Sequence, residues 1–217
     1  HGCTLPRGWE RMYPNFIANE AALASENVYF TEYFARQEAF QLALYPFTRN
    51  AVAAFDWGGI LMNHHMSKDN KSRHQRFTGD IFEMATAITN QCSVNCVALT
   101  PNALEGLPDF EKEWLKQVPT TWKDLRFLVG YPGKHFAVAR QTTEGKWYAA
   151  AISAEEQPIS MTLHLPMFAG KEVKVYADGP KKAGSFWLTP GMKRQKIGKN
   201  GLLKVIVQPR GGIIVNE

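Results

Sequence analysis

The chain has 217 residues, which fits one or two domains, and its content of 45% hydrophobic and 12% aromatic residues excludes a disordered polypeptide. Its formal net charge is +5, but Lys and Arg are scattered, with only mild clusters at 68–76 and 193–199. This distribution favours a solvated basic surface over nucleic-acid binding.

Cysteine content and hydropathy exclude a disulfide scaffold and a membrane span. Three cysteines, Cys3, Cys92 and Cys96, are too few for a disulfide framework. The last two are four residues apart on a predicted helix, where buried small side chains are favoured over weak metal ligands. No apolar run could span a bilayer and no signal peptide is present. Because the chain begins at His1 instead of Met, we expect it to be a piece of a longer protein.

Residues 1–119 mix short strand and helix patterns. Phe16-Ile17 and residues 42–46 are strand candidates, and residues 21–41 are predicted to be partly helical. An apolar run at 51–55 leads to Asp56, which precedes a Gly pair. That arrangement is typical of an acid presented at a sheet edge and equally of an ordinary turn.

Two helices are predicted before residue 119. The clearer one starts at Thr78, a suitable N-cap, and is expected to stop before Pro101. A second, short helix follows Pro108 and ends before Pro119.

A polar stretch ahead of these helices contains three histidines in eleven residues, His64, His65 and His74. They could bind a metal, but without a framing ligand pattern a mobile surface loop is favoured.

From residue 120 the pattern changes to short β-branched or aromatic runs separated by Gly, Pro or Asn, at 127–129, 135–141, 147–153, 160–165, 172–176, 203–207 and 213–215. Thr143-Glu144-Gly145 is a good hairpin turn between two of them. Successive strands without helices predict an antiparallel sandwich or barrel. We therefore divide the chain into residues 1–119 and 120–217.

Glu20 and Glu26 stand six residues apart after an apolar run. Two such acids could serve a glycosidase, bind a cation or simply face water. On residue type alone the solvent-facing interpretation is favoured, because Glu is usually exposed.

Motifs along the whole chain, in this order and spacing, resemble glycoside hydrolase family 97. They are His1-Gly2, Pro6-x-Gly8, Arg11-x-Tyr13-Pro14-Asn15, Asn19-Glu20, Glu26, Pro46-Phe47-Thr48-Arg49-Asn50, Phe55-Asp56-Trp57, Val118-Pro119-Thr120-Thr121-Trp122-Lys123-Asp124, Gly130-Tyr131-Pro132-Gly133, Trp147-Tyr148 and Tyr176-Ala-Asp-Gly179.

The resemblance implies a fold that is α/β plus all-β. Residues 1–119 would be the C-terminal part of a catalytic (β/α)₈ barrel, and residues 120–217 an antiparallel β-sandwich domain. The implied longer protein is an exo-acting, calcium-dependent α-glycosidase, periplasmic or secreted, that acts on oligosaccharides or glycosides. Its N-terminal part and an oligomeric assembly are the implied partners, with neither nucleic acid nor membrane.

Site residues carry over by the same resemblance. Glu26 stands at the position of the general acid/base, Glu20 at a carboxylate that helps to hold Ca²⁺, and His1 at a sugar-contacting histidine. Inverting α-glucosidases of the family carry a Glu after that histidine, whereas this chain has Gly2, as in the retaining, α-galactosidase-like branch. A retaining site needs a closely placed second carboxylate as nucleophile. That residue would precede His1, so the isolated fragment is expected to be inactive.

One departure and two alternatives remain. Relatives of the retaining branch have Gly between the two acids, but this chain has Glu20-Ala-Ala-Leu-Ala-Ser-Glu26, and Ala adopts positive φ less easily. The alternatives are an α-glucosidase of the same family and a non-catalytic carbohydrate-binding or structural module. The second would use Trp122, Trp147 and Trp187, although a core role for these tryptophans is favoured.

Overall fold

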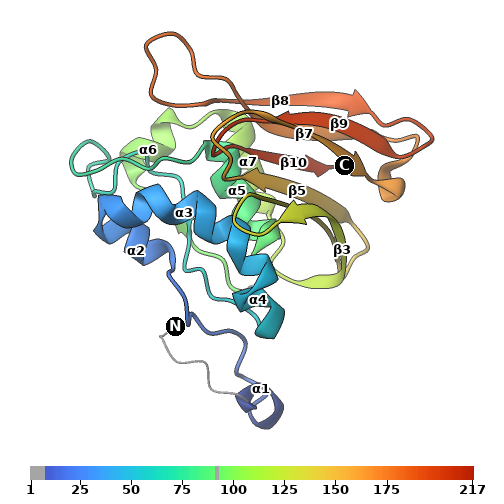
Figure 1. Ribbon diagram of the computed structural model, residues 1–217, viewed down its shortest axis with the longest axis horizontal. Helices are drawn as coiled ribbons and strands as arrows, with labels where there is room; N and C mark the ends of the chain where they lie inside the picture. Colours follow the sequence, from blue (N-terminus) through green and yellow to red (C-terminus); the bar gives the residue numbers. More distant parts are fainter. Residues whose placement is uncertain (1–7, 91–92) are drawn as a thin grey trace.

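The computed structural model of the protein describes residues 8–90 and 93–217. Helices lie on one side of a large sheet and a second, smaller sheet lies on the other (Figure 1). The N-terminal arm with α1 (Trp9–Met12) extends away from this body.

The large sheet has six antiparallel strands in the order β3-β4-β5-β10-β7-β8. Their bounds are β3 (Trp122–Tyr131), β4 (His135–Thr142), β5 (Trp147–Ser153), β10 (Gly212–Asn216), β7 (Glu172–Gly179) and β8 (Thr189–Lys196). The smaller sheet pairs β6 (Ile159–His164) with β9 (Leu202–Val207), also antiparallel. The antiparallel arrangement predicted for this part of the chain is confirmed.

The central strands β4, β5 and β10 of the large sheet are buried on both faces, because their side chains alternate between two cores. On β4, Ala137 and Ala139 face the smaller sheet, whereas Phe136 and Val138 face the helices. This explains why these strands read as continuous apolar runs instead of an apolar–polar alternation.

In the described ranges, six helical segments besides α1 and α5 precede the large sheet. They are α2 (Ser25–Phe30), α3 (Glu32–Leu44), the 3₁₀ turn η1 (Tyr45–Phe47), α4 (Arg49–Val52), α6 (Pro101–Gly106) and α7 (Asp109–Gln117). A 3₁₀ turn, η2 (Pro166–Phe168), follows β6.

Helix α5 (Asp80–Thr89) is buried along its whole length and lies across β5 and β10. Asp178 of β7 accepts hydrogen bonds from the backbone N–H groups of Ile81, Phe82 and Gly212, at 2.8–3.1 Å. Gly212 is required there, since a Cβ would lie 2.6 Å from the backbone of Phe82. One carboxylate therefore joins the start of α5 to two strands of the sheet.

The helical part contains short parallel pairings. Strand β1 (Ile60–Leu61) pairs in parallel with β2 (Val97–Ala98), and Asn19 bridges Phe55 in the same sense. The described residues do not close into a barrel, so the assignment of residues 1–119 to one stays a prediction about the longer protein. No helix in the described ranges is long and apolar enough to cross a membrane.

Several local predictions were wrong. Residues 42–46 end α3 and form η1 instead of a strand. Cys96 lies beyond α5 and is exposed, instead of being buried on a helix. The helix expected to start at Thr78 and to stop before Pro101 is confirmed, because α5 ends at Thr89. Strand β8 was missed because its basic, half-exposed sequence has no apolar alternation.

The histidine stretch is also packed more firmly than expected. Its ends are joined by hydrogen bonds from Met66 N to His74 O and from Arg76 N to His64 O, both 2.9 Å. Met66 and Arg76 are fully buried. The loop is thus held between the helices and the β7–β8 connection, and His64 stacks on Trp187 with ring centroids 4.1 Å apart.

The boundary at residue 119 marks a change in sequence pattern, but the two parts share a hydrophobic core. The core cluster on the helical face includes Leu42 and Ile88 from before it and Val138 and Ile214 from after it. Folding of the two parts is therefore coupled through shared buried surface, and the domain division stays a prediction.

Candidate functional site

Two acids, Glu20 and Asp56, each directly follow one residue of the parallel pair Asn19 and Phe55. Asp56 N donates to Asn19 O at 3.1 Å, and Asn19 N donates to Ala54 O at 3.5 Å. Glu20 follows Asn19 directly, so its carboxylate and that of Asp56 emerge side by side. The interpretation of Asp56 as an acid at a sheet edge fits this geometry.

Arg49 clamps these two segments together. Its guanidinium is buried and donates to the backbone carbonyls of Asn19 and Glu20 on one segment and of Ala53 and Ala54 on the other. Burial lowers the pKa of Arg49 from its usual value. The side chain therefore positions the two acid-bearing segments through their backbone carbonyls.

Glu26 lies at the start of α2, where the helix macrodipole favours a negative charge. The connection from Glu20 is pinned by two hydrogen bonds, from Tyr45 Oη to Leu23 O at 2.9 Å and from Ser25 N to Trp57 O at 2.8 Å. Glu26 is exposed, whereas only 3% of Glu20 is exposed.

Ala21 has a φ of 42°, in the left-handed region. A residue other than Gly is strained there, because its Cβ crowds the backbone. The replacement of Gly by Ala after Glu20 thus places backbone strain between the two acids.

Three carboxylates share this region. Burial raises the pKa of Glu20, and the nearby charges of Glu26 and Asp56 raise it further. Crowded like charges favour either a bound proton or a bound cation.

The donor chemistry suits calcium in kind, because carboxylate and amide oxygens are its preferred ligands. Glu20, Glu26 and Asp56 supply such oxygens, and the buried Oδ1 of Asn19 has no partner among the described residues. However, no group of three His, Cys, Asp or Glu side chains in the described ranges is arranged to hold a metal ion. A complete set of six to eight oxygens would need residues beyond those described.

The predicted site residues are thus partly placed. Glu20 and Glu26 lie close enough for the charge of Glu26 to raise the pKa of Glu20, and their roles stay predictions. His1 and Gly2, like Cys3 and Cys92, lie outside the described residues. Arg49 belongs to the motif at residues 46–50, but the sequence predicted no role for it. Only its contacts identify it as a positioning residue.

Comparison with known proteins gives this geometry a context. Residues 121–216 match the family model "Glycosyl-hydrolase 97 C-terminal, oligomerisation". A curated protein of Streptomyces bingchenggensis (strain BCW-1), described as "Probable retaining alpha-galactosidase", is 26% identical over 183 residues, which are 83% of this chain and 26% of that protein.

Two solved structures share the fold. A structure described as "Crystal structure of beta-arabinopyranosidase" is 43% identical with a TM-score of 0.91, covering 100% of this chain and 33% of that one. A glycoside hydrolase family 97 enzyme from Pseudoalteromonas sp. strain K8, in complex with acarbose, is 19% identical with a TM-score of 0.75, covering 96% of this chain and 32% of that one.

The chain spans about a quarter to a third of the length of the relatives it matches. The match of residues 121–216 and the likeness along almost the whole chain agree with the sequence motifs. The chain therefore carries the C-terminal region of glycoside hydrolase family 97 at residues 121–216, and its fold as a whole is that of a family 97 enzyme.

Proposed function

We propose that the chain is the C-terminal part of a retaining α-glycosidase that removes terminal α-galactosyl groups. The observation that carries the proposal is the exposed carboxylate of Glu26 beside the buried, charge-crowded Glu20. Gly2 supports retention, since it leaves no carboxylate at that position to activate water.

In the proposed reaction, Glu26 gives its proton to the leaving oxygen while a carboxylate from the upstream part of the protein attacks the anomeric carbon. Glu26 then takes a proton from the water that releases the sugar from the covalent intermediate. His1 would contact the sugar. Without the upstream nucleophile, the 217-residue chain alone does not turn over substrate.

Glu20 is the residue we propose as a calcium ligand, with Asp56 and Glu26 as neighbouring oxygen donors. Bound calcium would supply positive charge beside the sugar-binding site. Arg49 holds the backbone of Glu20 in place for this role. We also propose that the protein is exported or periplasmic, as the family resemblance implies.

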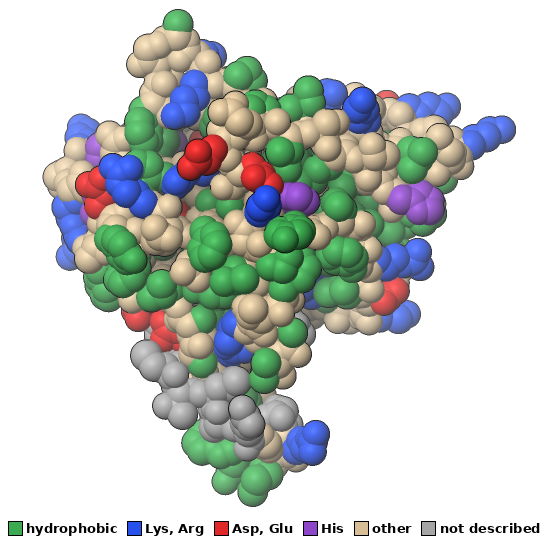
Figure 2. All heavy atoms as spheres, viewed as in Figure 1, with side chains coloured by type: hydrophobic (Ala, Val, Ile, Leu, Met, Phe, Trp, Pro, Cys, Tyr) green, Lys and Arg blue, Asp and Glu red, His purple; other side chains and the backbone are tan. Residues whose placement is uncertain are grey.

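Exposed aromatic residues support contact with the missing part of the protein or with a second copy. Phe40, Phe127 and Tyr131 are each roughly half exposed, and Figure 2 shows apolar side chains gathered over α3 and the β3–β4 hairpin. The family description names oligomerisation for the C-terminal domain.

A β-arabinopyranosidase is the second candidate, supported by the 43% identity along the whole chain. A β-L-arabinopyranose ring carries its hydroxyls as α-D-galactopyranose does and lacks only the hydroxymethyl group. On this proposal the two activities share a mechanism and differ only in the space that the hydroxymethyl group needs.

Kinetics of the full-length protein on aryl α-galactoside, aryl β-L-arabinopyranoside and aryl α-glucoside test the proposal. We expect the α-galactoside to be preferred, the product anomer to be retained, and activity to be lost with a chelator and restored by Ca²⁺. Preference for the arabinoside would replace the first candidate by the second, and an inverted product would exclude the retaining mechanism.

Glu26→Gln is expected to lower kcat by about 10²–10⁴-fold on substrates that need a proton donor, and far less on aryl glycosides with good leaving groups. Glu32→Gln, at an exposed Glu on α3, is the matched control and should retain activity. Equal losses in both variants would contradict an acid/base role for Glu26.

A further inference from the structure

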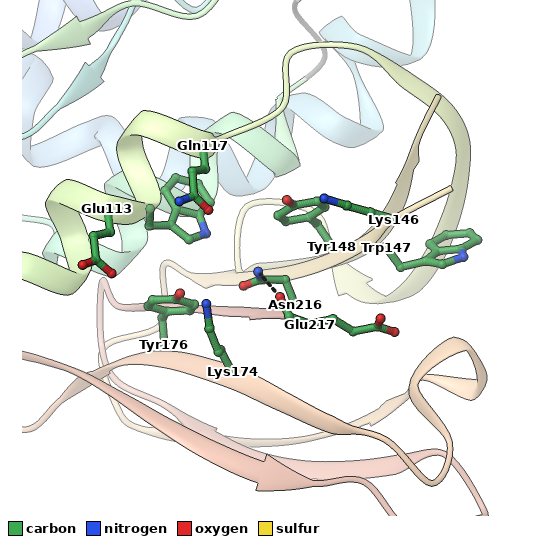
Figure 3. Close-up of a pocket in the computed structure, with 10 residues that line it drawn as sticks. Glu113, Gln117, Lys146, Trp147, Tyr148, Lys174, Tyr176, Asn216 and Glu217 are labelled. Carbon is green, nitrogen blue, oxygen red and sulfur yellow. Dashed lines mark hydrogen bonds between the residues drawn. The ribbon is translucent and has the colours of Figure 1, made fainter. Parts of the chain in front are cut away.

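A second pocket lies between α7 and the large sheet (Figure 3) and shares no residue with the acid pair. Its volume is about 320 Å³, within the range of small-molecule sites. Tyr148, Asn216 and Lys174 form one row across β5, β10 and β7, because Asn216 is paired with both of the others. Paired residues point to the same face of a sheet, so all three face α7.

The aromatic wall of the pocket is held in place by rings outside its lining. Trp122 packs edge-on against Tyr148, with centroids 5.8 Å apart, and Phe110 packs against Tyr176 at 6.1 Å. Tyr148 and Tyr176 thus offer pre-positioned apolar faces, which lowers the entropic cost of binding a ligand.

Two buried polar atoms of the pocket lining lack a partner. Asn216 is 9% exposed and its Oδ1 accepts no hydrogen bond, while Trp114 is 4% exposed and its Nε1–H donates none within the described residues. The Nδ2 of Asn216 donates to Glu217 O at 3.0 Å, which fixes the amide with its Oδ1 as the remaining acceptor. Burying a polar group without a hydrogen-bond partner is unfavourable, so one ligand that both donates and accepts would satisfy both atoms.

Charges around the pocket do not select an ion. Lys146 and Lys174 are offset by Glu113 and Glu217, although Glu217 is also paired with Lys171. Figure 3 shows Glu113 and Gln117 on α7, opposite Lys174 and Asn216 on the strands. Apolar ring faces, a buried donor, a buried acceptor and a balanced rim match a neutral ligand with hydroxyl groups around an apolar face.

We propose that this pocket binds a neutral saccharide, with one sugar ring against Tyr148 and Tyr176 and its hydroxyls paired with Asn216 and Trp114. The site is additional to the catalytic function proposed above and does not depend on it. A sugar bound here would hold a longer saccharide on the C-terminal domain without taking part in bond cleavage.

Fluorine NMR of the protein carrying 5-fluorotryptophan and Glu26→Gln tests the site, with the Trp114 resonance assigned by Trp114→Phe. The probes are methyl α-D-galactopyranoside, methyl β-L-arabinopyranoside and methyl α-D-glucopyranoside. We expect at least one to shift the Trp114 signal saturably, with a Kd of about 1 mM. No shift with any probe up to about 100 mM would overturn the proposal.

Variants of the pocket distinguish sugar binding from other causes of a shift in the Trp114 signal. Tyr148→Ala should weaken binding about tenfold or more, and Gln117→Ala, at an exposed helix position that leaves the core intact, about two- to fivefold. Leu202→Ala, at an exposed position on β9 of the smaller sheet, is the control and should bind as the unmodified protein does. Unchanged affinity in both folded pocket variants would refute the assignment.

Sedimentation of the same variants measures the oligomeric state and tests whether a second copy of the chain, instead of a sugar, occupies the pocket. A lower oligomeric state for Tyr148→Ala, together with no response to any sugar, would identify the pocket as an interface between copies and overturn the proposal. Hydrolysis of aryl glycosides by the Tyr148→Ala protein without Glu26→Gln should be unchanged, so failure here leaves the proposed catalytic function untouched.

Discussion

The two cores of the molecule differ in the types of residue that they contain. The core between the two sheets is a cluster of apolar side chains, among them Leu163, Val175 and Phe168. The core on the helical face also encloses charged residues, including Glu38, Arg76, Glu83 and Glu111, which are at most 1% exposed. An apolar core tolerates exchange of similar side chains, whereas a buried charge depends on each partner.

Arg76 organises the charged core. It donates to Leu61 O and to Asp80, whose Oδ1 also lies 3.2 Å from His64 Nε2. Burial raises the pKa of Asp80, but Arg76 and His64 outweigh this effect and hold it at about 2. Burial and the neighbouring Glu83 raise the pKa of Glu38 well above its usual value. Arg76 thus keeps Asp80 ionised, while Glu38 and Glu83 nearby favour the protonated form.

Removal of the Arg49 clamp should have the largest effect on the stability of the protein. Arg49→Met leaves four backbone carbonyls beside the acid pair without their donor, and we expect a loss of roughly 4 kcal/mol in the free energy of unfolding. Urea denaturation measures it. Arg194→Met, at an exposed Arg paired with Glu172, is the control and should cost less than about 1 kcal/mol. Similar losses at both positions would show that the clamp does not stabilise the site.

Glu111 provides a pH-dependent test. Both of its carboxylate oxygens are buried without a partner among the described residues. Burial, with Asp80 and then Asp178 adding to it against Arg76, raises its pKa to about 8 from 4.5. Between these values the folded protein keeps a proton that the unfolded chain releases. This stabilising contribution is therefore complete below pH 4.5 and is lost as the pH rises towards 8.

Glu111→Gln should accordingly raise the free energy of unfolding at pH 8 by roughly 4 kcal/mol relative to its effect at pH 4.5. Denaturation curves at the two pH values give this difference. Val175→Ala in the apolar core should cost about 1–2 kcal/mol equally at both. An effect of Glu111→Gln that does not change with pH would mean that folding does not raise the pKa of Glu111.

The smallest expected effect is at Ala21. Ala21→Gly removes the Cβ from a left-handed backbone position and should stabilise the protein by up to about 1 kcal/mol. In the same loop, Ala24 has a φ of −106°, so Ala24→Gly should instead destabilise it by about 0.5–1 kcal/mol. The opposite order of melting temperatures would exclude strain at Ala21.

Strand positions were predictable where side-chain alternation and turn residues agreed. Residues 147–153 were predicted with the bounds that β5 has, and the turn at Thr143-Glu144-Gly145 joins β4 to β5 with Gly145 at a φ of 88°. Residues 42–46 failed because their apolar run suits a buried helix end as well as a strand.

The candidate site was predictable only in its acids. Glu20 and Glu26 were found through a resemblance in spacing, and Asp56 through its place after an apolar run. Arg49 and the Tyr148–Asn216–Lys174 row could not be found, since hydrogen bonds between distant segments and strand order leave no periodic signal in the chain.

The sequence by itself determined most of the antiparallel strands after residue 120, the acid pair and the family resemblance, because each depends on local pattern or motif order. Only the tertiary structure decided that the central strands of the large sheet are buried on both faces, that Asp178 holds the start of α5, and that Arg49 joins the two acid-bearing segments. These features arise when residues far apart in sequence come to share buried polar contacts, and their energies depend on the geometry that the whole fold provides.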